Sequence, residues 1–287
     1  REARQLAPAD RAAIQSAVNE IGRRIAAFIQ ARRPELGDGQ ALLLAWSGLA
    51  VATSVSYHSL TLPEPAFTTL LGDLITTAID APIPPFEPKS VREVRQPALR
   101  SQSRRELILT EATKLFAANG FGSVSTDDIG ASVGISGPSV YNHFPAKSDI
   151  LIAAMVRGDE WLRIDMSRAF ASASDPRDGL NRLLRSYCAF VIDNPHLVAV
   201  LVSEVAHLPE SERHHTRASQ YSYIAEWVNL LREVHPHWDA VTARIRVQAA
   251  QTVMNDIALI PSLRHGTDIQ SALVTIGSEL LETTDPT

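Results

Sequence analysis

Four hydrogen-bonding side chains are crowded into five residues near the middle of this 287-residue chain: Ser139, Tyr141, Asn142 and His143. At helical spacing only Val140 and Phe144 would point inward, which leaves the polar side chains on the outer face. An Asn amide can pair in a bidentate way with an adenine edge, and Ser and Tyr hydroxyls suit phosphate oxygens. This composition favours a helix that reads DNA. The alternative is a polar surface helix on a small helical domain.

Local signals make this segment the third of three helices. An amphipathic pattern predicts a first helix from Arg104 to Asn119, ended by a glycine. Ser125 is expected to open a second, short helix through a capping box with Asp128, and Gly134 to stop it. Ser136 is expected to cap the third helix, which would end near Phe144. A longer helix bracing two short ones that are joined by a tight glycine turn is helix-turn-helix geometry.

The stretch from residue 104 to residue 147 resembles the DNA-binding domain of the TetR family of bacterial regulators. The resemblance rests on short matching pieces spread over the three helices: Ala112-x-x-Leu115-Phe116, Gly120-Phe121, Ser125-Thr126 before Ile129, Val133-Gly134-Ile135-Ser136 and Tyr141-x-His143-Phe144-Pro145-x-Lys147. It implies phosphate contacts from Thr126, Tyr141, His143 and Lys147, and base contacts from Ser139 and Asn142. Gly137 stands where many relatives carry a longer polar side chain.

The predicted DNA-binding set adds the flanking residues of the same segment. It comprises Arg104, Arg105, Ser125, Thr126, Ser136, Gly137, Pro138, Ser139, Tyr141, Asn142, His143 and Lys147. The expected partner is double-stranded operator DNA. The alternative from a different class is a helical ligand- or protein-binding module whose helix-turn-helix no longer reads DNA. That alternative draws on the formal charge of −5 and on the Gly137-Pro138 pair.

Charge is distributed unevenly along the chain. Residues 89–147 hold eight Lys/Arg and five Asp/Glu, a net charge of +3, so the remainder carries −8 of the total of −5. A mildly basic segment on an acidic body fits a specific regulator. The single cysteine, Cys188, lies among apolar residues and is interpreted as a buried structural thiol, which suits a reducing, cytoplasmic location.

One stretch could be mistaken for a membrane span, because Gly39 to Pro63 contains no charged residue. Its many Ser, Thr and small residues favour a buried helix with a close-packed partner, so no membrane is expected. The chain lacks a phosphate-binding glycine loop, a nucleophile elbow and a metal-ligand quartet. We therefore expect no enzyme activity, no cofactor and no metal.

Helical periodicity runs through the rest of the chain, and no strand pattern interrupts it, so the predicted fold class is all-α. The three helices of residues 103–147 are called the reading segment below. The other expected helices are 8–32, 42–60, 65–79, 146–171, 180–192, 195–207, 209–234, 238–260 and 269–281. Four prolines fall within residues 82–88, which predicts a semi-rigid linker over residues 83–102.

The two ends of the chain share a register of apolar residues. A shift of 202 residues places Pro34 on Pro236, Leu43 on Ile245, Val51 on Val253 and Leu71 on Leu273 without a gap. Both halves resemble the last helices of a TetR protein, and residues 1–6 resemble a motif that precedes them. Any two amphipathic helical hairpins could align in this way, which is the alternative explanation.

The resemblance then implies a tandem TetR protein of the kind that represses actinobacterial mammalian-cell-entry lipid-transport operons. The expected domains are 1–82, the end of a first copy; 83–102, a linker; 103–147, the helix-turn-helix; and 148–287, the ligand-binding and bundle part of a second copy. The last two helices of each copy would form a four-helix bundle within one chain, a monomeric pseudo-dimer. About 100 further residues that contain a second helix-turn-helix domain are expected upstream of Arg1.

Family behaviour also implies an effector. A small, apolar or lipid-like molecule is expected to enter the second copy, shift the helix after Lys147 and lower operator affinity. The candidate pocket residues are large and apolar at positions predicted to face inward: Met155, Trp161, Tyr187, Phe190, Leu201 and Trp227.

Overall fold

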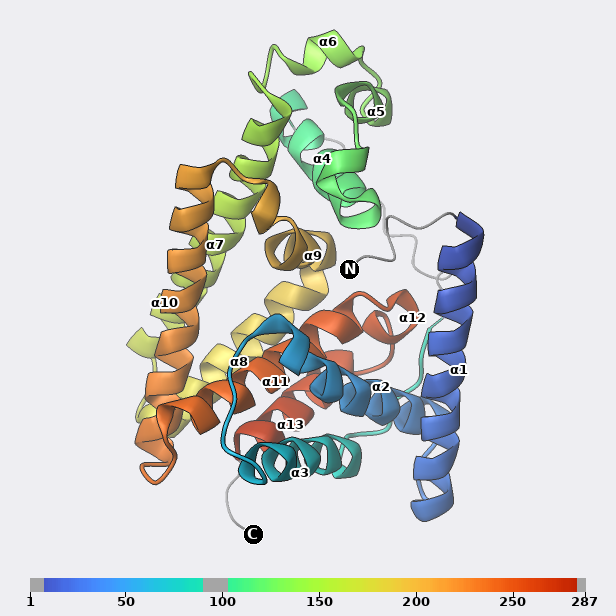
Figure 1. Cartoon of the computed structure of the whole chain (residues 1–287), viewed down its shortest axis with the longest axis vertical. Coiled ribbons are helices and arrows are strands. Elements are labelled where there is room, and N and C mark those ends of the chain that lie inside the picture. The colour runs from blue at the N-terminus through green and yellow to red at the C-terminus, as the bar shows by residue number, and fades with distance from the viewer. Residues whose placement is uncertain (1–7, 90–102, 283–287) are drawn as a thin grey trace. The chain divides into compact units, whose positions relative to one another are not determined.

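The computed structural model describes residues 8–89 and 103–282, and all regular elements within these ranges are helices (Figure 1). The all-α prediction is confirmed. The motif expected in residues 1–6 and the second half of the predicted linker lie outside the described residues. Contacts divide the chain into two compact units.

The first unit contains the predicted reading segment and the helices that contact it. Its elements are α4 (Arg104–Asn119), η4 (Phe121–Ser123), α5 (Thr126–Ser132), α6 (Gly137–Val140), α7 (Lys147–Ala171) as far as Ile164, α9 (Pro195–Ser203), η5 (Val205–His207) and α10 (Glu210–Val234) as far as Ser222. α4 packs on both α5 and α9, and α5 packs on α6.

The second unit is built around four helices that pack in a closed cycle. α2 (Asp38–Ser54) packs on α3 (Ala66–Asp80) and α11 (Ala240–Ala258), while α13 (Ile269–Leu281) packs on α11 and α3. The other elements are α1 (Pro8–Arg32) from Ala12 onward, η2 (Val55–Tyr57), α8 (Pro176–Asp193), α12 (Pro261–Arg264) and the ends of α7 and α10. α8 packs against α13 and α11. The sequence pattern missed α12, which is only four residues long.

α2 is the uncharged helix singled out in the sequence. Residues 38–57 are long and apolar enough to cross a membrane by length and composition alone, but 56% of this stretch is buried within the protein. Ala41, Leu43 and Val51 are fully buried, and a methyl group on Gly48 would lie 2.9 Å from Ile79 of α3. The small residues let α2 approach its neighbours closely, as predicted.

The predicted start of α2 at Leu42 is wrong by four residues. The helix begins at Asp38, because the Gln40 side chain accepts a hydrogen bond from the backbone N–H of Gly37 at 3.0 Å and caps the first turn. The apolar run begins only after this polar turn, so periodicity alone placed the start too late.

Helix bounds recur at a constant offset. α1 begins at residue 8 and α10 at residue 210, and each has 25 residues. α2 and α11 begin at residues 38 and 240, again 202 positions apart. α3 shifted by the same number spans residues 268–282, one residue beyond α13 at each end. The shared register of apolar residues therefore extends to the helix boundaries.

The first part of the predicted linker is built into the second unit. Phe86 is only 2% exposed, and its ring lies against Gly266, where a methyl group would collide with it. Lys89 donates its N–H to Ser262 at 3.0 Å, and the Glu87 carbonyl accepts from Thr267 at 3.0 Å. Residues 82–89 form no regular element, and these contacts hold them against the second unit.

Candidate nucleic-acid interface

Local capping fixes the ends of the first two helices of the reading segment. α4 is capped by Ser103, whose hydroxyl accepts from the N–H of Glu106 at 3.3 Å, and Gly120 ends it with a φ of 81°. Ser125 accepts from the N–H of Asp128 at 3.1 Å, and the Asp128 carboxylate accepts from the N–H of Ser125 at 2.8 Å. Hydrogen bonds from Ser125 hold the pKa of Asp128 below its usual value. The predicted capping box is confirmed.

The third helix differs from the prediction in two respects. The Ser136 hydroxyl does not cap it but shares a hydrogen bond with the Ser139 hydroxyl at 2.8 Å. α6 itself ends at Val140, and the chain continues in tight turns, with the Asn142 N–H donating to the Ser139 carbonyl at 3.3 Å. Pro145 sets the outer limit of this helical segment at Phe144, because the residue before a proline disfavours the α conformation.

The outward and inward faces of this segment are as predicted. Val140 and Phe144 are each 1% exposed, whereas Tyr141 is 50% exposed and Asn142 is also exposed. Ser139 and His143 are half-buried, and Pro138 is exposed at the start of α6. The Tyr141 hydroxyl lies 3.4 Å from the Thr126 hydroxyl, which places both beside each other at the junction of α5 with the α6 segment. Hydrogen-bonding groups therefore cover the face that the sequence predicted to read bases.

The basic residues of the predicted DNA-binding set, of which only Lys147 was assigned to phosphate, have partners inside the fold. Arg104 donates to the Val133 carbonyl at 2.9 Å, and Arg105 donates to the His143 carbonyl while its guanidinium lies 3.8 Å from the centre of the Phe144 ring. Lys147 donates to the carbonyls of Phe121 at 2.8 Å and Val124 at 2.7 Å. These contacts position α5 and α6, and they leave Lys147 only its third ammonium hydrogen for a phosphate.

Two glycines let α5 and α6 approach each other. A methyl group on Gly130 would lie 2.8 Å from the Ile135 carbonyl oxygen and 2.9 Å from the Gly137 nitrogen, both backbone atoms. A methyl group on Gly137, which is buried, would collide with the Asp127 carboxylate. The prediction grouped Gly137 with the DNA contacts, but its packing accounts for the absence of a side chain. Gly130 was missed, although a glycine inside a short helix is itself a signal of close packing.

Phe121 connects the reading segment with α7 and α9. Its N–H donates to the Glu204 carboxylate at 3.1 Å, its carbonyl accepts from Lys147, and its ring lies 4.2 Å from the Lys147 ammonium. The Glu204 side chain is 4% exposed and also accepts from Ser203 at 2.8 Å, with His207 3.1 Å away. Burial lowers the pKa of Lys147. Sequence reasoning gave Glu204 no role, since its partner is 83 residues away.

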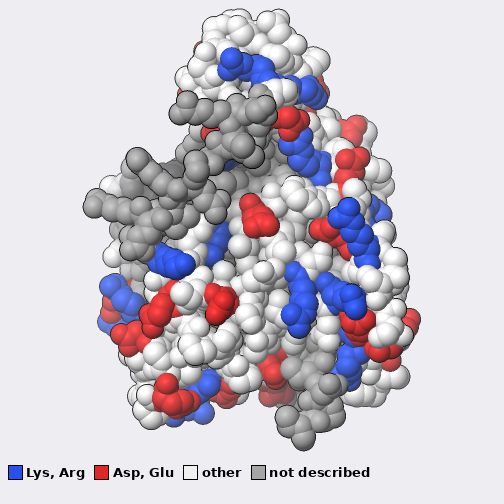
Figure 2. All heavy atoms as spheres, turned by 180° about the vertical axis from the view of Figure 1, so that it is seen from behind, with Lys and Arg blue, Asp and Glu red and all other residues white. Residues whose placement is uncertain are grey.

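The reading segment itself is close to neutral. Residues 103–147 contain four Lys/Arg and four Asp/Glu, so the excess of positive charge counted from residue 89 onward belongs to residues 89–102. On the face drawn in Figure 2, most of the surface of α4–α6 is uncharged. Hydrogen-bonding groups, more than net charge, therefore characterise this surface.

The predicted ligand residues of the first unit divide into buried and exposed. Met155 and Leu201 are 2% and 8% exposed, and Leu201 packs where a methyl group on Gly158 would touch it. Trp161 is 43% exposed, so its predicted inward position is wrong. The inward side of α7 runs from Gly158 to Leu162, four residues later. Trp161 is one residue before Leu162, so its side chain points about 100° away from that side.

The predicted ligand residues of the second unit are all buried. Tyr187, Phe190 and Trp227 are 8%, 3% and 0% exposed. The Tyr187 ring lies 5.7 Å from Trp227 and 6.3 Å from Tyr223, and its hydroxyl donates to the Asn255 side chain at 2.8 Å. Burial raises the pKa of both tyrosines, and of the Cys188 thiol to about 12. Cys188 is thus the buried thiol that its apolar neighbours predicted.

Residues 108–154 match the family model described as bacterial regulatory proteins, tetR family. The nucleoid occlusion factor SlmA of Vibrio vulnificus is 27% identical over 121 residues, which is 42% of this chain and 61% of that protein. The transcriptional activator FasR of Mycolicibacterium smegmatis is 26% identical over 93 residues, which is 32% of this chain and 42% of FasR. The chain thus matches less than two thirds of the length of either relative.

Among solved structures, a TetR-family transcriptional regulator from Bordetella parapertussis covers 62% of this chain and 95% of its own, with a TM-score of 0.57 and 18% identity. The fold is therefore TetR-like, and residues 108–147 of the reading segment lie within the part that matches the tetR family model.

Proposed function

We propose that this chain is a TetR-type transcriptional repressor that binds double-stranded operator DNA through α4–α6 and is released by a small apolar effector. The observation that carries the proposal is the polar face of the α6 segment, with Tyr141 and Asn142 exposed over a buried Val140 and Phe144. A face of this kind on a helix-turn-helix fits the major groove.

The proposed contacts follow from the side chains available. Asn142 and Ser139 would meet base edges, since an amide can donate to and accept from adenine at once. Thr126, Tyr141 and His143 would meet phosphates, together with the remaining hydrogen of the Lys147 ammonium. Arg104 and Arg105 would act mainly by fixing the Val133 and His143 carbonyls, because both already have partners there.

The proposed effector site is the aromatic core of the second unit. Tyr187, Phe190 and Trp227 would form its apolar wall. The amide nitrogen of Gln251 is buried without a hydrogen-bond partner among the described residues, one helical turn from Asn255, which binds Tyr187. A buried donor of this kind favours an apolar molecule that carries a hydrogen-bond acceptor.

We also propose that the chain contains parts of two fused copies of the fold, with their last helices paired in one chain. The recurrence of helix bounds at an offset of 202 residues supports this, as does the closed cycle of α2, α3, α11 and α13. TetR-type bundles join two subunits, so an internal bundle would make the chain a monomeric pseudo-dimer.

DNA footprinting on the region that flanks the protein's own gene tests the repressor proposal. The expected result is one protected site, which needs a higher protein concentration in Asn142→Ala. A fatty acid added as an apolar probe should reduce the occupancy of that site. A promoter fusion then gives the sign of the regulation, which matters because FasR, a relative, is an activator. The absence of any protected site would favour the second candidate, a binding module that does not read DNA.

The effector part has its own readout. Binding of the fatty acid should quench tryptophan fluorescence in the wild type and in Trp46→Phe, but not in Trp227→Phe, because Trp227 lies in the proposed site and Trp46 does not. Equal quenching in the two variants would contradict this placement of the effector.

A further inference from the structure

α1 exposes an unusual amount of apolar surface. Ile14, Val18, Ile21 and Phe28 are 45%, 37%, 49% and 63% exposed, although they repeat at helical spacing along one side of the helix. Only the neighbouring side is covered, where Ala26 and Ile29 are 9% and 2% exposed. Aligned apolar side chains left in water are a common mark of a surface that a partner covers.

The equivalent side of α10 is covered within this chain. At the offset of 202 residues, Ile21 corresponds to Tyr223 and Ile25 to Trp227, which are 6% and 0% exposed. The element that covers them is α8, whose Tyr187 ring lies 6.3 Å and 5.7 Å from those two rings. Phe28 corresponds to Leu230, which lies 3.8 Å from where a methyl group on Gly179 of α8 would be.

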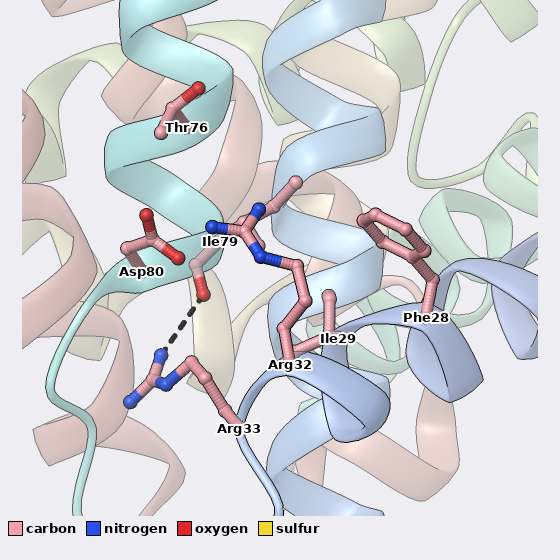
Figure 3. Close-up of a pocket in the computed structure, with 7 residues that line it drawn as sticks. All are labelled: Phe28, Ile29, Arg32, Arg33, Thr76, Ile79 and Asp80. Carbon is pink, nitrogen blue, oxygen red and sulfur yellow. Dashed lines mark hydrogen bonds between the residues drawn. The ribbon is translucent and has the colours of Figure 1, made fainter.

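A groove continues this exposed side of α1 towards α3. Figure 3 shows Phe28, Ile29 and Arg32 on the last turns of α1, and Arg33 directly after it, facing Thr76, Ile79 and Asp80 on α3. Its accessible volume is about 60 Å³, whereas small-molecule pockets usually hold roughly 300–1,000 Å³. The space suits one or two protein side chains better than a free ligand.

At the corresponding place beside α10 and α13 lies the start of α8, which contacts both helices. There Arg177 of α8 donates to the Glu282 carbonyl at 3.4 Å, and His235 lies 3.0 Å from the same oxygen. In the α1 groove, Arg33 takes the place of His235 and donates to the Ile79 carbonyl at 3.2 Å. Each place therefore has a side chain that follows the first helix beside a backbone carbonyl at the end of the last helix, and only the place beside α10 and α13 also has α8.

We propose that the exposed side of α1 and the α1–α3 groove bind an amphipathic helix of the α8 kind, supplied by the first copy of the same polypeptide. The proposal rests on the two-copy organisation proposed above. A small residue of this helix would pack over Phe28, and larger apolar residues over Ile21 and Ile25. The first turn of this helix would carry an acidic side chain that pairs with Arg32. Arg32 corresponds to Val234 of α10 at the offset of 202 residues, and it has no hydrogen-bond or ion-pair partner among the described residues.

The test compares the accessibility of position 28 in the whole gene product with that in the chain of residues 1–287. Phe28→Cys provides a thiol for labelling by a maleimide, and the natural Cys188 does not interfere because it is fully buried. Tyr221→Cys is the matched control, since Tyr221 is also 63% exposed and lies on the other helix of the pair, α10.

The expected result is labelling at position 28 that is about tenfold or more slower in the whole gene product, with equal rates at position 221 in the two forms. Arg32→Glu in the whole product should speed labelling at position 28, because it places like charges in contact. Equal rates at position 28 in the two forms would overturn the proposal.

Protection that disappears on dilution would also overturn it, because a second chain rather than the same polypeptide would then be the occupant. Labelling does not depend on DNA. A failure of operator binding would therefore contradict the proposed function without changing this result, and the two failures can be told apart.

Discussion

Asn142 is the residue on which the proposed base readout depends most. Its side chain is exposed beside Tyr141, on the outer face of a segment whose inner face is buried. Asn142→Ala should weaken binding to the operator by about 1–3 kcal/mol, and only at the base pairs it contacts, because the amide is lost while the phosphate contacts remain. Titration of operator variants by fluorescence anisotropy measures this.

Tyr141→Phe is the control for Asn142→Ala, since it removes a hydroxyl proposed to bind phosphate. It should weaken binding to all sequences alike and leave the salt dependence nearly unchanged, because the lost hydroxyl carries no charge. A uniform loss in Asn142→Ala as well would contradict its assignment as a base-reading residue.

At the scale of residues, inward-facing positions and local caps could be predicted from the sequence better than long-range hydrogen-bond partners. The inward positions of Val140 and Phe144 followed from spacing four apart, and the capping box from Ser125 and Asp128 followed from local chemistry. The hydrogen-bond partners of Arg104 and Lys147 could not be predicted, because they are backbone carbonyls 29 residues from Arg104 and 23–26 residues from Lys147. Nothing in the local sequence shows that a surface cation has such an acceptor.

Gly130 controls the angle between α5 and α6. Gly130→Ala should lower both the stability of the first unit and operator affinity, because its methyl group would meet backbone atoms at 2.8–2.9 Å that have no room to move. A loss of about 1–3 kcal/mol in the free energy of unfolding is expected. Urea denaturation measures it.

Gly122→Ala is the matched control, because no atom lies within 4 Å of the added methyl group. It should leave stability within about 0.5 kcal/mol of wild type. Equal behaviour of the two variants would show that α5 and α6 are not in contact as described.

Glu204 links α9 to the reading segment through the Phe121 N–H. Glu204→Ala should weaken operator binding about tenfold, because the buried N–H loses its acceptor and the end of α4 loses its fixed position. Glu204→Gln should largely restore affinity, since an amide oxygen can accept the same hydrogen bond. Operator affinities of the two variants, measured alongside their circular dichroism, decide this.

If both Glu204 variants bound DNA like wild type, α9 would have no part in positioning α4.

At the scale of elements, the existence of the helices could be predicted from periodicity alone, and α1 and α13 were predicted with the bounds that the structure has. Helix ends that are set by side-chain caps, as at α2, could not be predicted in this way. The burial of Phe86 could not be predicted either, since a proline-rich stretch gives no sign of the loop that will cover it.

The four-helix core of the second unit is expected to stabilise a single chain. Val51 is fully buried where α2 packs, so Val51→Asp should lower the free energy of unfolding by about 3 kcal/mol or more, through an unpaired buried charge. Thr53→Asp, two residues along and exposed, should change it by less than about 0.5 kcal/mol. Thermal denaturation at two protein concentrations measures both.

If the melting temperature of wild type rose with protein concentration, the core would be completed by a second chain. At the scale of the whole molecule, the sequence showed a register of apolar residues shared by its two ends, and the helix bounds recur at the same offset of 202 residues. That the two ends belong to two copies of one fold stays a prediction. Which sides of α1 lie open to water could not be predicted, because its apolar stripe looks like that of any covered amphipathic helix.

The proposed regulator has one reading segment and one internally paired bundle, so the most direct test is the composition of the protein–DNA complex. Sedimentation velocity of residues 1–287 with a duplex from the footprinted site measures the mass of that complex. The expected result is one 31.3 kDa chain per site at submicromolar protein, with affinity that falls as salt rises. Two chains per site, or no complex up to about 10 μM protein, would contradict it.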